Sequence, residues 1–355
     1  MIQNPLIQLL LAPLSLLYGL GISLRNFLYK KGILKGVEFD VPLISVGNLS
    51  IGGAGKTPHI EYLIRLLKDY LNVATISRGY KRKTKGFLIV KPNHNANAVG
   101  DEPLQFKRKF QDVLVTVSES RTFAVPQILI EQPESQVILL DDAFQHLSIT
   151  PGLNILLTEF SYPFTKDYLL PSGRLREWRS AYHRADIIVV SKCPFQISEN
   201  DKSAFIEEIN PLSRQRIYFS YYKYGQPYFL LNTNYRLNLS PDLDVVLISA
   251  IARADYLVEY LEKHVNSIQA LEYEDHHYFT KFDVSQLKNT FSNIDSPKKI
   301  ILTTEKDAMR LELHHQFIVE NKLPVYVLPV KVAFHFDEGE IFDNDIKQFL
   351  LNFKN

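Results

Sequence analysis

The sequence predicts an α/β protein: a domain built on a parallel β-sheet, followed by a second, smaller α/β domain. Three observations predict this fold class. Continuous apolar runs recur with helical or turn-rich segments between them, as in parallel strands covered on both faces. A glycine-rich turn links one such run to a helix. The pattern is interrupted once, after residue 216, and then resumes, and 355 residues are enough for about two cores.

The chain begins with an apolar segment. Residues 5–24 (PLIQLLLAPLSLLYGLGISL) carry no charge over 20 residues, which is enough to cross a bilayer. The basic residues that follow, from Arg25 to Lys35, would keep the rest of the chain cytoplasmic. A helix lying in the membrane interface and a buried core helix are the alternatives. A secretory signal is disfavoured, because no Lys or Arg precedes the run and no cleavage site follows it. We expect residues 1–35 to associate with a membrane.

The most informative motif follows an apolar strand at 41–46 and precedes a helix at 59–70. It reads SIGGAGKT, a phosphate-binding loop (P-loop) whose backbone N–H groups would cradle phosphate oxygens at a helix N-terminus. Lys56 would neutralise the β- and γ-phosphates, and the Thr57 hydroxyl would ligate Mg²⁺. A serine stands where the strict pattern has its first glycine. The predicted phosphate site comprises Ser50, Ile51, Gly52, Gly53, Ala54, Gly55, Lys56 and Thr57.

Further apolar runs predict the other strands. In the first domain they span residues 73–77, 113–117, 137–140, 155–157 and 187–190, giving a sheet of five or more strands. An aromatic stretch at 217–231, broken by Gly-Gln-Pro, predicts a strand pair or a hinge. The second domain is predicted to have strands at 245–249, 300–303 and 325–330, and helices are predicted at 255–264 and 342–353.

These elements divide the chain into five parts. We predict an apolar N-terminal segment (1–35), a P-loop domain (36–216), a hinge or strand-pair linker (217–231), a smaller α/β domain (232–333) and a C-terminal helix (334–355). The formal net charge of +1 gives no reason to expect a nucleic-acid partner. The single cysteine, Cys193, excludes an internal disulfide and a cysteine-rich zinc site, which fits a reducing cytoplasm.

Acidic residues occur at three informative places. Asp141 and Asp142 follow the strand at 137–140, where Mg²⁺ is held beside a P-loop strand, although a helix N-cap pair is an alternative. Asp101 and Glu102 lie in a turn bounded by glycine and proline, which alone is a weak signal. The run EDHHY at 274–278 fits a metal site, a histidine that orients a carboxylate base, or simple surface residues.

Arginines follow several predicted strands. Arg78, Arg121 and the pair in PSGRLRE at 171–177 suit bidentate phosphate recognition, and ordinary surface ion pairs are the alternative. The run TTEKDA at 303–308 fits a capped helix start as well as a site.

The motifs, taken in order, resemble the tetraacyldisaccharide 4′-kinase family, the membrane-associated lipid A kinases of Gram-negative bacteria. The resemblance covers nearly the whole chain. It rests on PLSLLYGL (13–20), SVGNLSIGGAGKTP (45–58), SRGY (77–80), VGDEPL (99–104), DDAFQH (141–146), LPSGRLRE (170–177), ADIIVVSK (185–192), DHHYFT (275–280) and TTEKDA (303–308). The family usually has glycine at Ala143, and alanine is tolerable there if φ is negative.

The resemblance implies that ATP and Mg²⁺ are used to phosphorylate the 4′-hydroxyl of an acylated glucosamine disaccharide 1-phosphate, giving lipid IVA at the cytoplasmic face of the inner membrane. It implies that Asp101 accepts the hydroxyl proton, that His276 orients Asp101, and that Lys56 neutralises charge. It further implies that Thr57, Asp141, Asp142 and Glu177 arrange Mg²⁺. The residues that match other active-site positions of the family are Arg78, Tyr80, Arg121, Gln145, His146 and Arg176.

Two other functions fit part of the sequence. A soluble small-molecule kinase would need the same ATP site but not the apolar N-terminus. A membrane-tethered P-loop ATPase or GTPase switch would act through partner proteins, but the guanine-selecting N-K-x-D motif is absent from the sequence. Labelling of a glycolipid, with no activity on soluble sugars, would discriminate the lipid kinase from both.

Overall fold

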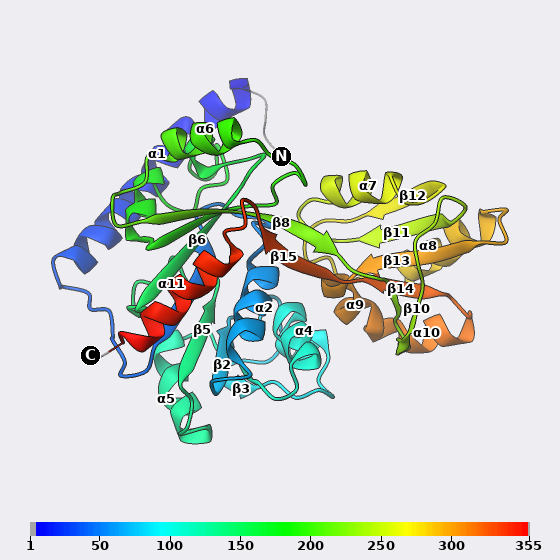
Figure 1. Cartoon of the computed structure of the whole chain (residues 1–355), viewed down its shortest axis with the longest axis horizontal. Helices are drawn as coiled ribbons and strands as arrows, with labels where there is room; N and C mark the ends of the chain where they lie inside the picture. Colours follow the sequence, from blue (N-terminus) through cyan, green and yellow to red (C-terminus); the bar gives the residue numbers. More distant parts are fainter. Residues whose placement is uncertain (1–4, 354–355) are drawn as a thin grey trace.

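The computed structural model describes residues 5–353. They form two sheets in two lobes that lie side by side, with both ends of the described chain in the larger lobe (Figure 1). Strands β8 (Arg216–Tyr224) and β15 (Val330–Phe334) run toward the smaller lobe and join the two. The α/β fold class predicted from the sequence is confirmed.

The larger sheet has nine strands in the order β15-β8-β7-β6-β1-β5-β2-β4-β3. Besides β8 and β15 it contains β1 (Leu43–Asn48), β2 (Val73–Ser77), β3 (Leu88–Ile89), β4 (Leu114–Val117), β5 (Val137–Asp141), β6 (Leu153–Glu159) and β7 (Ile187–Ser191). All pairs from β8 to β4 are parallel, and the edge strands β15 and β3 are antiparallel to their neighbours. Every strand predicted for the first sheet is present, because runs buried on both faces carry a strong apolar signal.

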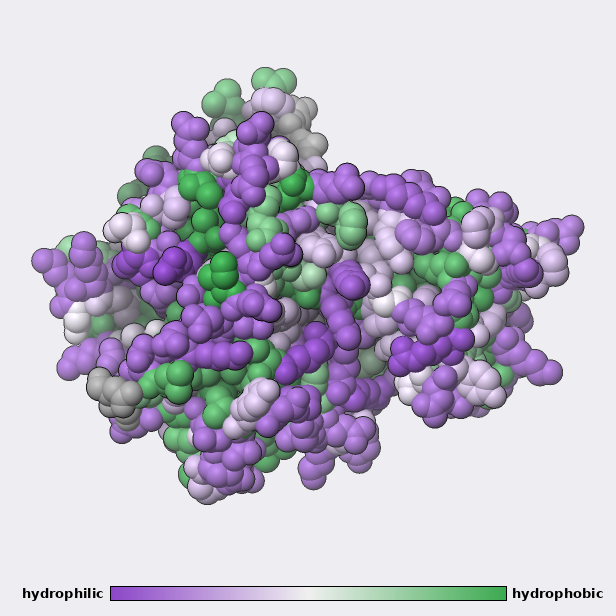
Figure 2. Space-filling model, in the orientation of Figure 1, coloured by the Kyte–Doolittle hydropathy of each residue, from purple (hydrophilic) through white to green (hydrophobic). Residues whose placement is uncertain are grey.

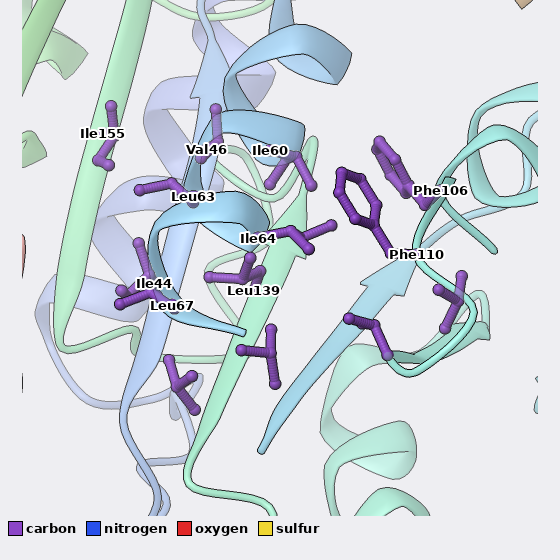
Figure 3. Packing of buried hydrophobic residues seen from close by; sticks show 14 of the residues in the cluster. Ile44, Val46, Ile60, Leu63, Ile64, Leu67, Phe106, Phe110, Leu139 and Ile155 are labelled. Carbon is purple, nitrogen blue, oxygen red and sulfur yellow. The ribbon is translucent and has the colours of Figure 1, made fainter. Parts of the chain in front are cut away.

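Helices cover both faces of this sheet. On one face α2 (Lys56–Leu67), α4 (Asp101–Lys109) and α11 (Gly339–Leu351) share a core with β1, β5 and β6. Figure 3 shows Ile60, Leu63 and Ile64 of α2 gathered over the apolar side chains of β1 and β5. The other face is covered by α5 (Arg121–Glu131) and α6 (Glu199–Ile209), each in its own apolar cluster. The short helix α3 (Ala96–Val99) and two 3₁₀ turns, η1 (Phe164–Lys166) and η2 (Arg179–Arg184), complete the lobe.

The smaller sheet has six strands in the order β10-β9-β14-β13-β11-β12. They are β9 (Tyr228–Phe229), β10 (Asn232–Arg236), β11 (Asp244–Ser249), β12 (Ser267–Glu272), β13 (Lys299–Thr304) and β14 (Val325–Leu328). The four strands from β14 to β12 are parallel. The helices of this lobe are α7 (Asp255–Glu262), α8 (Lys281–Asn293), α9 (Glu305–Leu311) and α10 (His315–Glu320), with the 3₁₀ turn η3 (Glu312–His314) before α10.

Two short connections carry the chain between the sheets. The aromatic stretch at 217–231 does not form a hairpin: β8 lies in the larger sheet and β9 in the smaller one. The strand predicted at 325–330 is two strands, because Pro329 separates β14 from β15, which returns to the larger sheet. The predicted end of the smaller domain at residue 333 therefore lies inside β15. The domain division itself stays a prediction, and strand membership favours Pro329 as its second boundary.

The N-terminal segment forms the helix α1 (Pro5–Lys30), of 26 residues. Only Ser15, Gly19 and Ile22 are buried, along a single seam at helical spacing, so the interpretation as a core helix is wrong. The described chain contains one helix long and apolar enough to cross a membrane, and it is α1. In Figure 2 apolar residues mark its N-terminal end at the top of the molecule.

Candidate active site

The P-loop connects β1 to α2, and its glycines are required by its backbone. Gly52 and Gly55 have φ of 111° and 86°, a region that side chains disfavour. A Cβ on Gly55 would also fall 2.5 Å from the hydroxyl of Tyr222. Ser50 is not among the described residues with left-handed backbone, and it pairs with Leu175 in an isolated bridge. The serine at the first glycine position of the motif is therefore accommodated without strain.

Lys56, the first residue of α2, points back to the end of β1. Its Nζ lies 3.2 Å from Oδ1 of Asn48 and 3.6 Å from Oδ1 of Asp142. Arg176 donates two hydrogen bonds to the carboxylate of Asp142, from Nη2 to Oδ1 at 2.8 Å and from Nη1 to Oδ2 at 3.1 Å. Burial alone would raise the pKa of Asp142, but the charges of Lys56 and Arg176 outweigh it and hold the pKa well below its usual range. Asp142 is therefore an anion within an array of cations.

The pKa of Asp141 is shifted in the opposite direction to that of Asp142. It ends β5, in register with Val46 of β1, and burial raises its pKa to about 7, helped by the nearby carboxylates of Glu102 and Asp142. Its Oδ2 accepts from Ser77, and its Oδ1 is buried without a hydrogen-bond partner among the described residues. An orphaned oxygen among carboxylates is a place that a cation would complete.

Thr57 is also an expected magnesium contact, and its Oγ1 donates to Oε1 of Glu102 at 3.1 Å. Mg²⁺ is commonly held by one or two carboxylates, with substrate phosphates and water supplying the rest. No group of three or more His, Cys, Asp or Glu side chains arranged for a metal occurs within residues 5–353. The donor set of Thr57, Asp141 and Asp142 fits a magnesium ion brought in with a nucleotide better than a permanent metal centre.

No helix begins after Asp142, so the interpretation of the aspartate pair as an N-cap is wrong. Asp142 itself has a φ of 47°, in the left-handed region. Ala143 is not among the described residues with positive φ, so the backbone there accepts alanine as readily as the glycine that the resemblance led us to expect.

Glu177 does not join this group. It is fully buried, and its two carboxylate oxygens are each 2.9 Å from an arginine, Arg25 of α1 and Arg184 of η2. Its contacts therefore fasten α1 to the larger lobe. The role in arranging Mg²⁺ that the resemblance implied for Glu177 has no support from these contacts.

Asp101 and His276 meet between the lobes. Nδ1 of His276 lies 3.0 Å from Oδ2 of Asp101, which is the first residue of α4. Arg310 of α9 donates to the same oxygen at 2.7 Å, and the backbone N–H of Glu102 donates to Oδ1. Burial would raise the pKa of Asp101, but the charge of Lys306 and the hydrogen bond from His276 hold the pKa well below its usual range.

The two histidines of the turn at 274–278 make different contacts. His276 has left-handed backbone, with φ of 57°, and reaches across to Asp101. His277 instead contacts Asp283 at 2.9 Å, and Asp283 closes the capping box of α8 with Thr280. The interpretation of the run as simple surface residues is wrong for His276, and the metal interpretation finds no cluster in the described chain.

The remaining predicted residues lie near the ends of β1 and β5 or against His276. Arg121 is buried and donates to the backbone oxygen of Asp141 at 3.0 Å. His146 lies 3.5 Å from Arg121, and burial lowers its pKa to about 4. Gln145 donates to the backbone oxygen of Asn48, so these three side chains shape the ends of β1 and β5. Tyr80 lies against the ring of His276, with centroids 4.6 Å apart.

A cavity between the lobes unites the two halves of the site. The P-loop from Gly52 to Pro58 lines one side, and His276, Lys306 and the aromatic residues Tyr222 and Tyr256 line the others. A second cavity lies between α1 and the P-loop. Its lining residues are Leu17, Tyr18, Gly21, Ile22, Arg25, Ile51, Arg78, Gln145, Leu170 and Arg176. Thus Arg78, Gln145 and Arg176 face the helix side of the P-loop.

Sequence reasoning assigned no role to four side chains in or beside the inter-lobe cavity: Glu102, Lys192, Lys306 and Arg310. Glu102 accepts from Thr57 and from Lys306, Arg310 binds Asp101, and Lys192 is buried beside Glu159, with burial lowering its pKa to about 8. Lys306 and Lys192 stand in motifs that were quoted for the family resemblance, so the signal was present. Only the packing of α9 against α4 reveals what Lys306 and Arg310 reach.

Comparisons with known proteins give the family. Residues 7–350 match the family model described as tetraacyldisaccharide-1-P 4′-kinase. A tetraacyldisaccharide 4′-kinase of Bacteroides thetaiotaomicron is 41% identical over 348 residues, which is 95% of this chain and 91% of the relative. A tetraacyldisaccharide 4′-kinase of Flavobacterium johnsoniae is 41% identical over 347 residues, which is 97% of this chain and 98% of the relative. A crystal structure of the "apo" form of LpxK from Aquifex aeolicus in complex with ATP has a TM-score of 0.73 and 30% identity, over 97% of this chain and 99% of the other.

Proposed function

The chain belongs to the tetraacyldisaccharide-1-P 4′-kinase family, and from that premise we propose how its site transfers the γ-phosphate of ATP to the 4′-hydroxyl of an acylated disaccharide 1-phosphate, forming lipid IVA. It is a phosphotransferase of lipid A biosynthesis. One observation carries the proposed mechanism: the P-loop and His276, which lies 3.0 Å from the buried Asp101, come from different lobes and line one cavity.

ATP occupies the inter-lobe cavity in this proposal. Its phosphates lie on the N–H groups from Gly52 to Thr57, at the N-terminus of α2, where the helix dipole favours anions. The aromatic and apolar side of the cavity, which includes Tyr222, Tyr256 and Leu257, suits the adenine ring. The ATP complex of the Aquifex aeolicus relative supports this cofactor.

Thr57, Asp141 and Asp142 would hold Mg²⁺. When bound, the ion neutralises charge on the β- and γ-phosphates. The residues fit this role because Oδ1 of Asp141 is buried without a hydrogen-bond partner among the described residues, and the hydroxyl of Thr57 lies beside the carboxylate of Glu102. Lys56 supplies the complementary fixed charge, held near the end of β1 by Asn48 and Asp142.

Asp101 accepts the proton of the sugar hydroxyl, and His276 orients Asp101. The low pKa of Asp101 makes it a weak base for an alcohol. Phosphoryl transfer runs through a loose transition state, in which the nucleophile loses its proton late and position matters more than basicity. Donors on both carboxylate oxygens hold Asp101 in one orientation, which is what such a mechanism needs.

The glycolipid reaches the site along α1. The second cavity lies between α1 and the P-loop and is lined by leucines and by the arginines Arg25, Arg78 and Arg176, which suits a substrate with both acyl chains and phosphate. The seam of α1 is fastened at Ser15 to Leu169, at Gly19 to Trp178 and at Arg25 to Glu177. Because the helix is bound to the lobe along this length, we propose that it lies in the interface of the inner membrane, on the cytoplasmic face, rather than crossing it.

The test is transfer of labelled γ-phosphate to disaccharide 1-phosphate in detergent. Wild-type protein is expected to label the glycolipid and not soluble sugars. Asp101→Ala is expected to lose activity by about 10²–10⁴-fold. Glycolipid labelling that survives in Asp101→Ala would remove Asp101 as the base, and absence of labelling by wild-type protein would contradict the proposed substrate.

A further inference from the structure

Lys306 is a largely enclosed cation at the junction of the lobes, with 17% of its side chain exposed. It is the second residue of α9, whose start is capped by Thr304, with the backbone N–H of Asp307 donating to the threonine hydroxyl. The cap fixes the direction in which the first turn of α9 presents its side chains. The run TTEKDA is therefore both a capped helix start and part of the site, because the same turn points Lys306 into the inter-lobe cavity.

The ammonium group of Lys306 meets three partners. Nζ lies 3.0 Å from Nε2 of His276, 3.2 Å from Oε1 of Glu102 and 3.7 Å from Oδ1 of Asp275. Two of these partners are carboxylates, and they raise the pKa of Lys306 above its usual range despite its burial, so the group is an ammonium ion. An ammonium ion can only donate hydrogen bonds. The Nε2 of His276 must therefore be the acceptor, with no proton of its own.

From this contact we infer that Lys306 is a positioning residue that holds His276 as the neutral imidazole with its proton on Nδ1. That proton points at Oδ2 of Asp101, 3.0 Å away. The inference rests on the proposed function, in which Asp101 accepts the proton of the sugar hydroxyl. It adds to that function the group that decides which nitrogen of His276 carries the proton.

The consequence concerns the carboxylate. With its proton on Nδ1, His276 acts as a donor to Asp101 and cannot present a lone pair to it. Asp101 then keeps its negative charge and a fixed orientation. If Nε2 carried the proton instead, Nδ1 would turn a lone pair toward the carboxylate, and the oxygen of Asp101 would lose that donor. The tautomer therefore decides whether the pair is aligned for proton acceptance.

The other groups around the ring are consistent with this assignment. Tyr80 packs against the imidazole, Lys81 donates to the backbone oxygen of His276 at 3.0 Å, and Asp275 lies 3.9 Å from Nε2. The distance to Asp275 is too long for a hydrogen bond, so Lys306 is the partner that determines the state of Nε2. Lys306 also joins Glu102, and through it Thr57, to the histidine.

Nitrogen-15 NMR of histidine-labelled full-length protein reads the tautomer directly, without any substrate. His276 is assigned by the signal that disappears in His276→Gln. We expect wild-type His276 to show a protonated Nδ1 and an unprotonated Nε2, and we expect Lys306→Met to convert the signal to the Nε2–H form or to a mixture. A wild-type protein with its proton on Nε2 would overturn the inference, whether or not any variant folds.

Kinetics supply the second readout. Lys306→Met is expected to lower kcat by about 10²-fold, with the KM for ATP changed by less than about threefold, and Lys306→Arg is expected to keep the Nδ1–H signal. The matched control is Arg108→Gln, which breaks another ion pair between α4 and the small lobe, that with Glu312, and is expected to leave kcat and the tautomer unchanged. A fall in kcat with the tautomer intact, or an equal fall in Arg108→Gln, would overturn the inference. A wild-type protein that shows the tautomer but labels no glycolipid would contradict the proposed function and leave the assignment of the proton standing.

Discussion

Arg310 of α9 donates from Nη1 to Oδ2 of Asp101 at 2.7 Å, joining the first residue of α4 to the smaller lobe by a fully buried ion pair. The same guanidinium binds Asp307 and the backbone oxygen of Ala250. Two anions therefore depend on one cation that solvent does not reach.

Replacing Arg310 by Met is expected to destabilise the protein by about 3–5 kcal/mol, because it removes a buried hydrogen-bonded cation from both Asp101 and Asp307. Urea denaturation measures the loss. The control Arg108→Gln breaks a half-buried pair on the same two lobes and should cost about 0–1 kcal/mol. A variant of Arg310 that is as stable as this control would show that the buried pair contributes little.

Lys56→Ala is expected to lower glycolipid phosphorylation by about 10²–10³-fold while leaving the thermal midpoint unchanged. Lys56 lies at the cavity and contacts Asn48 and Asp142 rather than the apolar core. The control is Lys68→Ala, which removes a partly exposed cation at the C-cap of the same helix. Transfer within a few-fold of wild type in Lys56→Ala would mean that ATP binds elsewhere.

The Asp101–His276 pair makes a prediction about additivity. Asp101→Ala and His276→Ala should each lower kcat strongly, by about 10²–10⁴-fold, with little change in ATP affinity. Because the two residues act as one unit, the double variant should lose scarcely more than the worse single variant. Single-turnover kinetics on all three variants measure this, and losses that multiply would separate the two roles.

The membrane prediction concerns the exposed side of α1. Leu9, Leu10 and Leu17 are 65–78% exposed, and their joint replacement by Gln is expected to move much of the protein from the membrane pellet to the soluble fraction. Each leucine contributes about 2 kcal/mol when it is buried in an apolar phase. Replacing the exposed Tyr235 and Val319 of the smaller lobe by Gln is the control, and it should leave the pellet fraction unchanged. Unchanged pelleting of the leucine variant would assign the membrane contact to another surface.

Glu305 provides a pH dependence. Burial raises its pKa to about 7, and the neighbouring charge of Glu61 adds to the shift, while Lys109 opposes it at 2.7 Å. A carboxyl whose folded pKa lies above its unfolded pKa binds its proton more tightly in the folded state. The free energy of unfolding therefore falls as pH rises from about 4.5 to 7. Over this pH range the titration of Glu305 lowers the free energy of unfolding by roughly 3 kcal/mol.

Glu305→Gln is therefore expected to raise the free energy of unfolding at pH 8 relative to wild type, and to reduce its fall between pH 5 and pH 8. Urea denaturation at both pH values measures the difference. Glu312→Gln, on the adjoining turn η3 and partly exposed, is the control and should follow the wild-type profile. A Glu305 variant whose stability falls with pH as steeply as the wild type would contradict the assignment.

The strands and the P-loop could be predicted because their signals are local. Continuous apolar runs mark strands buried on both faces, and Gly55-Lys56-Thr57 fixes a turn and a helix start together. Pro329 itself signals a break in the run from Val325 to Val330, because proline cannot donate to a strand ladder. That the two resulting strands belong to different sheets could not be predicted, since only their pairing partners show it.

The site was predictable where a motif carries its own chemistry and not where a contact joins residues far apart in the sequence. Glu177 illustrates the limit: its neighbours in sequence suggested phosphate chemistry, but both of its oxygens bind arginines that hold α1 in place. Lys306 illustrates the converse, because nothing within TTEKDA indicates that the ammonium will lie 3.0 Å from a histidine 30 residues earlier. Long-range packing decides both cases.

Within residues 5–353 the chain passes from one sheet to the other near Gly225 and near Pro329. These two positions touch: the N–H of Gly225 donates to the oxygen of Pro329 at 2.9 Å, and a Cβ on Gly225 would fall 3.0 Å from the proline ring. Two adjacent pivots define a single axis of rotation. Any swing of the smaller lobe about that axis moves His276, Lys306 and Arg310 together relative to Asp101. The same rotation would then widen the inter-lobe cavity for a nucleotide and separate Asp101 from His276 and Arg310.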